Sequence, residues 1–135
     1  MLTRGEPLAE SKPAVILVED DPSVLRALRR LMVSCGFDVL AFTRPSELQA
    51  TTIPDSNTCL MLDVHLPEMT GVELYETLSA AGCRLPVIMI TGHADYSTRL
   101  MISRINAVEV LVKPFGRDML LAAITKALSL SANLP

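Results

Sequence analysis

The chain has 135 residues, half of them hydrophobic, which is enough for one domain with a substantial core. Its net charge of −3 gives no electrostatic basis for direct nucleic-acid binding, and no apolar run approaches the roughly 18 residues that a membrane span needs. The three cysteines are far apart and odd in number, which argues against a disulfide framework or a zinc site and favours a cytoplasmic location.

Two kinds of segment alternate along the chain from residue 14 onward. Short apolar, β-rich runs predict five strands, at residues 14–18, 37–42, 59–63, 86–90 and 108–112. Segments with apolar residues at helical spacing follow them and predict five helices, at residues 22–35, 45–50, 71–81, 95–105 and 117–130. This alternation predicts a doubly wound, flavodoxin-like α/β fold, (βα)5, with a five-stranded parallel sheet in the order 2-1-3-4-5.

Residues with special backbone preferences mark the ends of several expected helices. Asp21 is a suitable N-cap, and Pro22 is a suitable first residue of the helix after the first strand. Gly36, Gly82 and Asn106 are expected to end helices in the left-handed conformation.

The same patterns set the expected domain boundaries. Residues 1–13 mix glycine, prolines and charges without a period and predict a flexible N-terminal tail. The domain is expected at residues 14–130, and residues 131–135 are expected to be a C-terminal tail or the start of a linker.

Polar residues stand at the carboxyl ends of four expected strands, where open α/β sheets bind ligands. The carboxylates of Glu19, Asp20 and Asp63 are expected to share one crevice, where each pair at about 5 Å would repel by roughly 3 kcal/mol. A hard divalent cation, Mg²⁺ or Mn²⁺, would offset this repulsion, with Lys113 as a second positive charge and Thr91 as a hydroxyl donor. This set suits phosphoryl transfer, so we expect Asp63 to accept a phosphoryl group.

Four motifs in this order resemble those of the receiver domain of response regulators in bacterial two-component signalling, over about residues 14–130. They are Val18-Glu19-Asp20, Leu62-Asp63-Val64-His65-Leu66-Pro67-Glu68-Met69-Thr70-Gly71, Thr91-Gly92-His93 and Val112-Lys113-Pro114-Phe115. The segment 91–95, Thr-Gly-His-Ala-Asp, is most similar to receivers that carry a helix-turn-helix transcriptional output.

The resemblance implies a switch that catalyses its own phosphorylation and dephosphorylation, rather than turnover of a small-molecule substrate. Asp63 would take the phosphoryl group from a phosphohistidine of a sensor histidine kinase or phosphotransfer protein. Lys113 would pair with that group, and Thr91 would swing towards it. The face formed by the fourth helix, fifth strand and fifth helix would then switch, and it could also form a homodimer.

The resemblance also implies a metal site and several tuning positions. Asp20 and Asp63 would ligate Mg²⁺, with Glu19 acting through water and the backbone carbonyl of His65 completing the protein ligands. His65 and His93 each follow a motif residue by two positions, and we expect at least one to tune the lifetime of the acyl phosphate. The bond between Lys113 and Pro114 is often cis in this family.

Two departures from the family pattern stand out. Val110 occupies the position where an aromatic switch residue is usual, and its single stiff torsion cannot swing as a ring does. Asn106 stands where glycine is usual. Within the fourth helix, Met101 or Ile105 is expected to belong to an interaction patch.

Other functions remain open from the sequence. If Val110 has broken the relay, the chain would be a phosphorylation-independent adaptor that keeps the fold as an interaction module. A flavodoxin-like cofactor binder is disfavoured, because the chain has no tryptophan and its first loop is acidic rather than phosphate-cradling.

Overall fold

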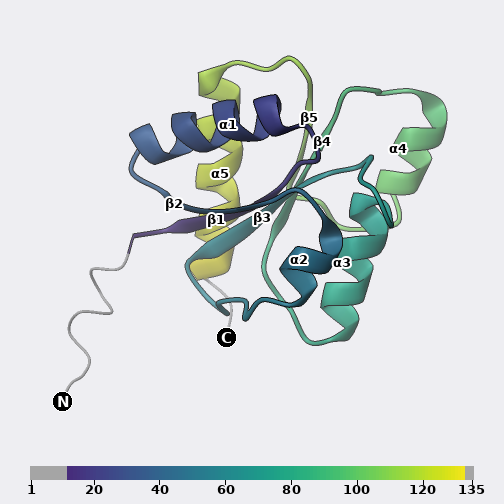
Figure 1. Ribbon diagram of the computed structural model, residues 1–135, viewed down its shortest axis with the longest axis horizontal. Helices are drawn as coiled ribbons and strands as arrows, with labels where there is room; N and C mark the ends of the chain where they lie inside the picture. The colour runs from purple at the N-terminus through teal and green to yellow at the C-terminus, as the bar shows by residue number, and fades with distance from the viewer. Residues whose placement is uncertain (1–11, 133–135) are drawn as a thin grey trace.

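The computed structural model describes residues 12–132 of the chain (Figure 1). Nearly all of the predicted N-terminal tail, and residues 133–135 of the predicted C-terminal one, lie outside this part. The strands are β1 (Ala14–Val18), β2 (Asp38–Phe42), β3 (Thr58–Asp63), β4 (Val87–Thr91) and β5 (Glu109–Val112). The helices are α1 (Pro22–Ser34), α2 (Pro45–Gln49), α3 (Gly71–Ala80), α4 (Tyr96–Ile102) and α5 (Arg117–Ala132).

The five strands form one parallel sheet in the order β2-β1-β3-β4-β5, which confirms the predicted topology. Helices cover both of its faces (Figure 1). One hydrophobic core joins the sheet to α1 and α5, and a second joins it to α2, α3 and α4. The central β3 is buried over its whole length, which explains why its sequence is a continuous apolar run rather than an alternating one.

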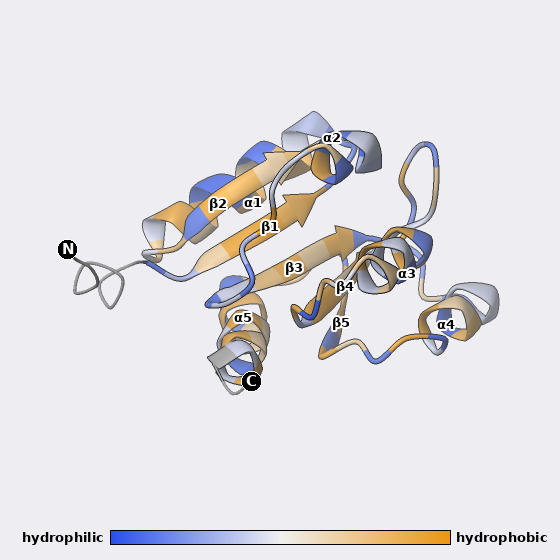
Figure 2. Ribbon diagram, turned by 90° about the horizontal axis from the view of Figure 1, so that it is seen from below, coloured by the Kyte–Doolittle hydropathy of each residue, from blue (hydrophilic) through white to orange (hydrophobic). Residues whose placement is uncertain are grey.

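Side chains of the central strands alternate between the two cores. Cys59 and Met61 of β3 enter the core on the side of α1 and α5, whereas Leu60 and Leu62 enter the opposite core. All four are fully buried, and each large one contributes roughly 1.5–3 kcal/mol to folding. Figure 2 shows the corresponding concentration of hydrophobic residues in the strands.

The predicted ends of α1 and α3 are confirmed. The Asp21 carboxylate caps α1 by accepting hydrogen bonds from the backbone N–H groups of Ser23 and Val24, at 2.9 and 3.3 Å. Gly36 and Gly82 have φ angles of +97° and +102°, which glycine adopts without steric cost.

The predicted end of α4 is wrong. The helix ends at Ile102 rather than at residue 105, and Asn106 is not among the described non-glycine residues with positive φ. The Ser103 hydroxyl donates to the backbone carbonyl of Leu100 at 2.6 Å. The next two N–H groups bond to carbonyls three residues back instead of four, which tightens and ends the helix before Asn106.

Helix α5 extends two residues beyond the predicted end at residue 130. The Ser131 side chain is buried, and its hydroxyl oxygen accepts a hydrogen bond from the N–H of Thr58 at 3.4 Å. Ser131 therefore joins the end of α5 to the start of β3.

The exposed apolar residues of α4 also differ from the expectation. Met101 and Ile105 pack against a core, whereas Tyr96 and Leu100 are exposed.

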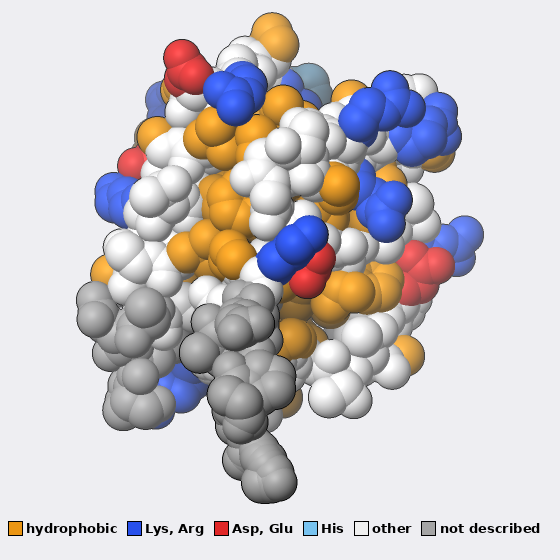
Figure 3. Space-filling view, turned by 90° about the vertical axis from the view of Figure 1, so that its left-hand side faces the viewer, with side chains coloured by type: hydrophobic (Ala, Val, Ile, Leu, Met, Phe, Trp, Pro, Cys, Tyr) orange, Lys and Arg blue, Asp and Glu red, His pale blue; other side chains and the backbone are white. Residues whose placement is uncertain are grey.

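On the face that Figure 3 shows, hydrophobic side chains are visible among lysine and arginine side chains, as is common on protein surfaces. Among residues 12–132, no helix has the length and apolar character needed to cross a bilayer.

Candidate functional site

Three carboxylates meet at the carboxyl edge of the sheet, as predicted. Strands β1 and β3 are parallel neighbours, with Val18 opposite Leu62, so the residues that follow them lie side by side. One ligand oxygen each from Glu19, Asp20 and Asp63 lie within 4.8 Å of one another. The parallel register thus brings Asp63 next to acids that are 43 and 44 positions earlier in the chain.

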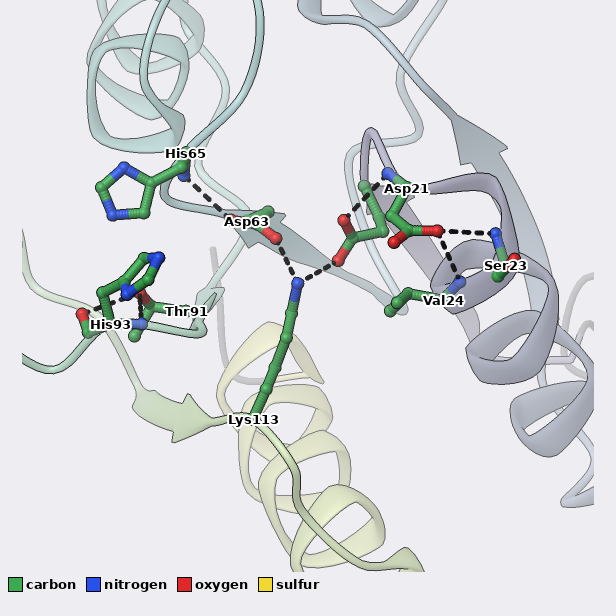
Figure 4. Close-up of polar contacts among 9 residues, drawn as sticks. Asp21, Ser23, Val24, Asp63, His65, Thr91, His93 and Lys113 are labelled. Atoms are coloured by element: carbon green, nitrogen blue, oxygen red, sulfur yellow. Dashed lines mark hydrogen bonds and ion pairs between the residues drawn. The ribbon is translucent and has the colours of Figure 1, made fainter.

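Lys113 reaches this cluster from the end of β5 and bridges two of the acids (Figure 4). Its Nζ lies 2.6 Å from Asp63 Oδ2 and 2.7 Å from Glu19 Oε1. The sequence placed Lys113 in this crevice as a positive charge, but its pairing with Glu19 was not anticipated. The Lys113–Pro114 peptide bond is cis, as the resemblance implied.

Burial dominates the electrostatics of Glu19. Its side chain is 1% exposed, and this burial raises its pKa to about 7, although the contact with Lys113 partly opposes the shift. For Lys113, burial acts to lower the pKa, but the hydrogen bond to Asp63 and the contact with Glu19 outweigh it and raise the pKa above the usual range. Lys113 therefore carries a permanent charge at the site.

The donor set fits a hard divalent cation. Glu19 Oε2 accepts a hydrogen bond from the N–H of Asp21 at 3.2 Å, and its buried Oε1 has the Lys113 ammonium group, at 2.7 Å, as its polar neighbour. Asp63 Oδ1 accepts a hydrogen bond from the N–H of His65 at 2.8 Å. Carboxylate oxygens with unused acceptor capacity are the ligands that Mg²⁺ and Mn²⁺ prefer.

Thr91 is at the predicted strand end, but its hydroxyl is engaged within its own loop. It donates to the carbonyl of His93 at 2.9 Å and accepts from the N–H of His93 at 3.0 Å. Both histidine side chains are exposed, and the rings of His65 and His93 meet edge to face with centroids 5.5 Å apart (Figure 4).

Val110 lies beside a pocket next to Thr91. The side chain is 40% exposed, and with Thr91, Ala94 and Thr98 it lines a pocket of about 300 Å³ between α4 and the sheet. The position that usually carries an aromatic residue therefore adjoins open space rather than a filled core.

Gly71 contributes to the site in a way that the sequence analysis missed. It is the first residue of α3, and a Cβ there would lie 2.1 Å from the backbone oxygen of Asp63. A usable signal was present: glycine is a poor helix former, so its place directly after the capping residue Thr70 indicates a close backbone approach.

Comparison with known proteins gives consistent matches. A family model described as a response regulator receiver domain matches residues 15–125. Nodulation protein W of Bradyrhizobium diazoefficiens is 38% identical over 123 residues, 91% of this chain and 54% of that protein. The transcriptional regulatory protein FixJ of Azorhizobium caulinodans is 32% identical over 126 residues, 93% of this chain and 59% of that protein.

A solved structure of the response regulator StyR is 38% identical and superimposes with a TM-score of 0.78, covering 90% of this chain and 62% of that one. The chain thus spans about half the length of the curated relatives it matches.

Proposed function

Because the chain belongs to the response regulator receiver domain family, we propose that Asp63 is its phosphoryl acceptor. The observation that carries this proposal is the position of Asp63, at the centre of an acidic cluster and 2.6 Å from the Lys113 ammonium group. Its side chain is 5% exposed, so it is oriented by its neighbours while lying at the edge where a donor can approach.

The reaction needs a nucleophile and charge stabilisation. A carboxylate oxygen of Asp63 attacks the phosphorus of a phosphohistidine on a sensor kinase or phosphotransfer protein. The phosphorus–nitrogen bond breaks, and the released imidazole takes up a proton. Lys113 pairs with the phosphoryl oxygens, and Thr91 exchanges its hydrogen bonds with His93 for one to the phosphoryl group.

Glu19, Asp20 and Asp63 would hold Mg²⁺ or Mn²⁺, together with the backbone carbonyl of His65 and with Glu19 acting through water. The bound ion would neutralise negative charge on the phosphoryl oxygens. We infer that His65 and His93, whose exposed rings contact each other, control water access to the acyl phosphate and so its lifetime.

The acyl phosphate on Asp63 makes different contacts with Lys113 and Thr91 from those of the free Asp63 carboxylate. This difference in contacts can shift a conformational equilibrium. We place the output on the α4–β5–α5 face, which also suits a homodimer. The exposed large apolar residues of these three elements are Tyr96, Leu100, Val110, Val112, Met119 and Leu130. The longer relatives support a transcriptional output for a full-length protein.

The three cysteines are unpaired, which supports a reducing, cytoplasmic location.

The test is modification by a small phosphodonor. With acetyl phosphate and Mg²⁺, the wild type should gain one phosphoryl group by intact mass, and beryllofluoride should raise its melting temperature. Asp63→Asn should show neither effect. Asp38→Asn, which makes the same change at the far end of β2, should behave as the wild type. An unmodified wild type, or a modified Asp63→Asn, would contradict the proposal.

A further inference from the structure

The loop between β3 and α3 follows Asp63 and carries His65, whose carbonyl is a proposed metal ligand. Its base is held by the sheet and by α3. Val64 N–H donates to the carbonyl of Ile90 at 2.9 Å, and Gly71 N–H donates to the carbonyl of Val64 at 2.8 Å. These bonds fix both ends of the loop but leave its tip, residues 66–69, to be held by other contacts.

The tip is tied to α2 by one side chain. Glu68 Oε1 accepts a hydrogen bond from the backbone N–H of Ser46 at 3.0 Å, and Glu68 Oε2 accepts one from the Ser46 hydroxyl at 3.1 Å. The two residues are 22 positions apart, and in the described part of the chain the tip makes no other hydrogen bond to a different element. We call this pair of bonds the Glu68–Ser46 clamp.

The backbone at Glu68 supports a built contact. Its φ is +74°, in the left-handed region that residues with a Cβ adopt only at a cost. Such a conformation persists where the surroundings over-determine it. Leu66 and Met69 of the tip pack against the core, and the clamp adds a polar constraint, because two charge-assisted hydrogen bonds to one residue fix the position and the direction of the Glu68 carboxylate.

We propose that Glu68 is a positioning residue that ties the phosphoacceptor loop to α2 and so holds the His65 carbonyl where a divalent cation can use it. This inference rests on the proposed function for its metal ligand. The clamp also couples the β3–α3 loop and α2 in both directions. Any movement of the loop at Asp63 must move α2 or break the clamp, and a movement of α2 must act on the loop in the same way.

Four variants distinguish the loss of the two hydrogen bonds from the loss of the negative charge and from a change of backbone preference at position 68. Glu68→Ala removes both hydrogen bonds, and Glu68→Gly removes them while allowing the positive φ. Glu68→Gln keeps a carbonyl acceptor for the N–H and an amide that can bond to the hydroxyl. Glu76→Ala is the matched control, because it also removes an exposed glutamate that hydrogen-bonds another element, the Arg104 side chain.

The first measurement is the dissociation constant for Mg²⁺, obtained from the dependence of melting temperature on its concentration. The dissociation constants of Glu68→Ala and Glu68→Gly for Mg²⁺ should be at least about threefold higher than that of the wild type. Glu68→Gln and Glu76→Ala should stay within about twofold of the wild type. Equal affinity in wild type and Glu68→Ala, or equal loss in Glu68→Gln and Glu68→Ala, would overturn the proposal.

The second measurement is amide hydrogen exchange over residues 44–50 in the metal-free protein. Exchange should be faster in Glu68→Ala and Glu68→Gly than in the wild type and Glu76→Ala. Unchanged exchange in both clamp-deficient variants would overturn the clamp even if the wild type binds Mg²⁺. A wild type that does not bind Mg²⁺ would instead contradict the proposed metal site, while the exchange data would still decide whether the clamp exists.

Discussion

At the scale of single residues, the site depends on one lysine that neutralises two nearly buried acids. Asp63 is 3% exposed and Glu19 is 1% exposed, and each lies within 2.7 Å of Lys113 Nζ. Removing one partner of a buried charge group is costly, because the remaining charges keep their desolvation penalty without the attraction that offset it.

Lys113→Ala should therefore lower the free energy of unfolding of the metal-free protein by about 2 kcal/mol, and Mg²⁺ should restore part of the loss. Lys126→Ala is the control, because Lys126 pairs with Glu109 at 3.1 Å on the exposed surface, where such pairs contribute at most about 1 kcal/mol. Urea denaturation with and without Mg²⁺ measures both. Equal losses in the two variants would show that the bridging position of Lys113 does not matter.

Gly71 is the second residue whose effect is local and severe. Gly71→Ala would place a methyl group 2.1 Å from the backbone oxygen of Asp63, so α3 or β3 must shift. We expect a loss of about 2–3 kcal/mol in stability, as for overpacking, and slower phosphorylation by acetyl phosphate. Gly116→Ala, where a Cβ meets nothing within 4 Å, should leave both nearly unchanged. Wild-type rates and stability in Gly71→Ala would refute the close approach.

At the scale of elements, two adjacent acids in the connection between β1 and α1 have different roles. Asp20 contributes a ligand atom to the acidic cluster, whereas the Asp21 side chain caps the helix through Ser23 and Val24. Only Glu19, Asp20 and Asp21 separate the end of β1 from the start of α1, so the carboxylate for the ligand and the carboxylate for the cap follow each other directly.

Substitutions at these two positions should have opposite effects. Asp20→Asn should raise the metal-free melting temperature, because it removes repulsion, and should abolish stabilisation by Mg²⁺. Asp21→Ala should lower the free energy of unfolding by about 1 kcal/mol through loss of the cap, with Mg²⁺ affinity retained. Thermal melts at several Mg²⁺ concentrations test both. A lower metal-free melting temperature in Asp20→Asn would argue against an unrelieved acidic crevice.

At the scale of the whole molecule, the two cores bury the centre of the sheet so completely that a thiol there does not react with solvent reagents in the folded state. Cys59 of β3 is fully buried, and burial raises the pKa of its thiol to about 12. Cys35 and Cys83 are only partly buried. The reactive thiolate of Cys59 is therefore scarce at neutral pH, and the surrounding side chains block access to it.

Labelling with a thiol reagent at pH 8 should modify Cys35 and Cys83 in the native protein, and Cys59 only after unfolding. Mass spectrometry of the labelled peptides gives the assignment. Native labelling of Cys59 at the rate of the other two would mean that the central strand opens far more readily than its packing indicates.

The parts of the fold that the sequence predicted depend on local information. The apolar run from Cys59 to Leu62, bounded by Asp63, predicted the buried central strand. The alternation of five such runs with helical segments predicted the topology. The end of α4 escaped prediction, because hydrogen bonds of Ser103 and the residues after it ended the helix before Asn106. The spacing of apolar residues does not show where such hydrogen bonds replace the regular ones of a helix.

The sequence by itself determined that acids, a threonine and a lysine would stand at strand ends, because strand ends follow from hydrophobic runs and turn residues. Only the tertiary structure decided which groups touch: Lys113 with Glu19 as well as Asp63, Gly71 against the Asp63 backbone, and Glu68 on Ser46. The contacts of Lys113 and of Glu68 join residues that lie far apart in sequence, and the Gly71 contact depends on how α3 packs against the end of β3. Their geometry depends on sheet register and loop packing, which no single segment of the chain encodes.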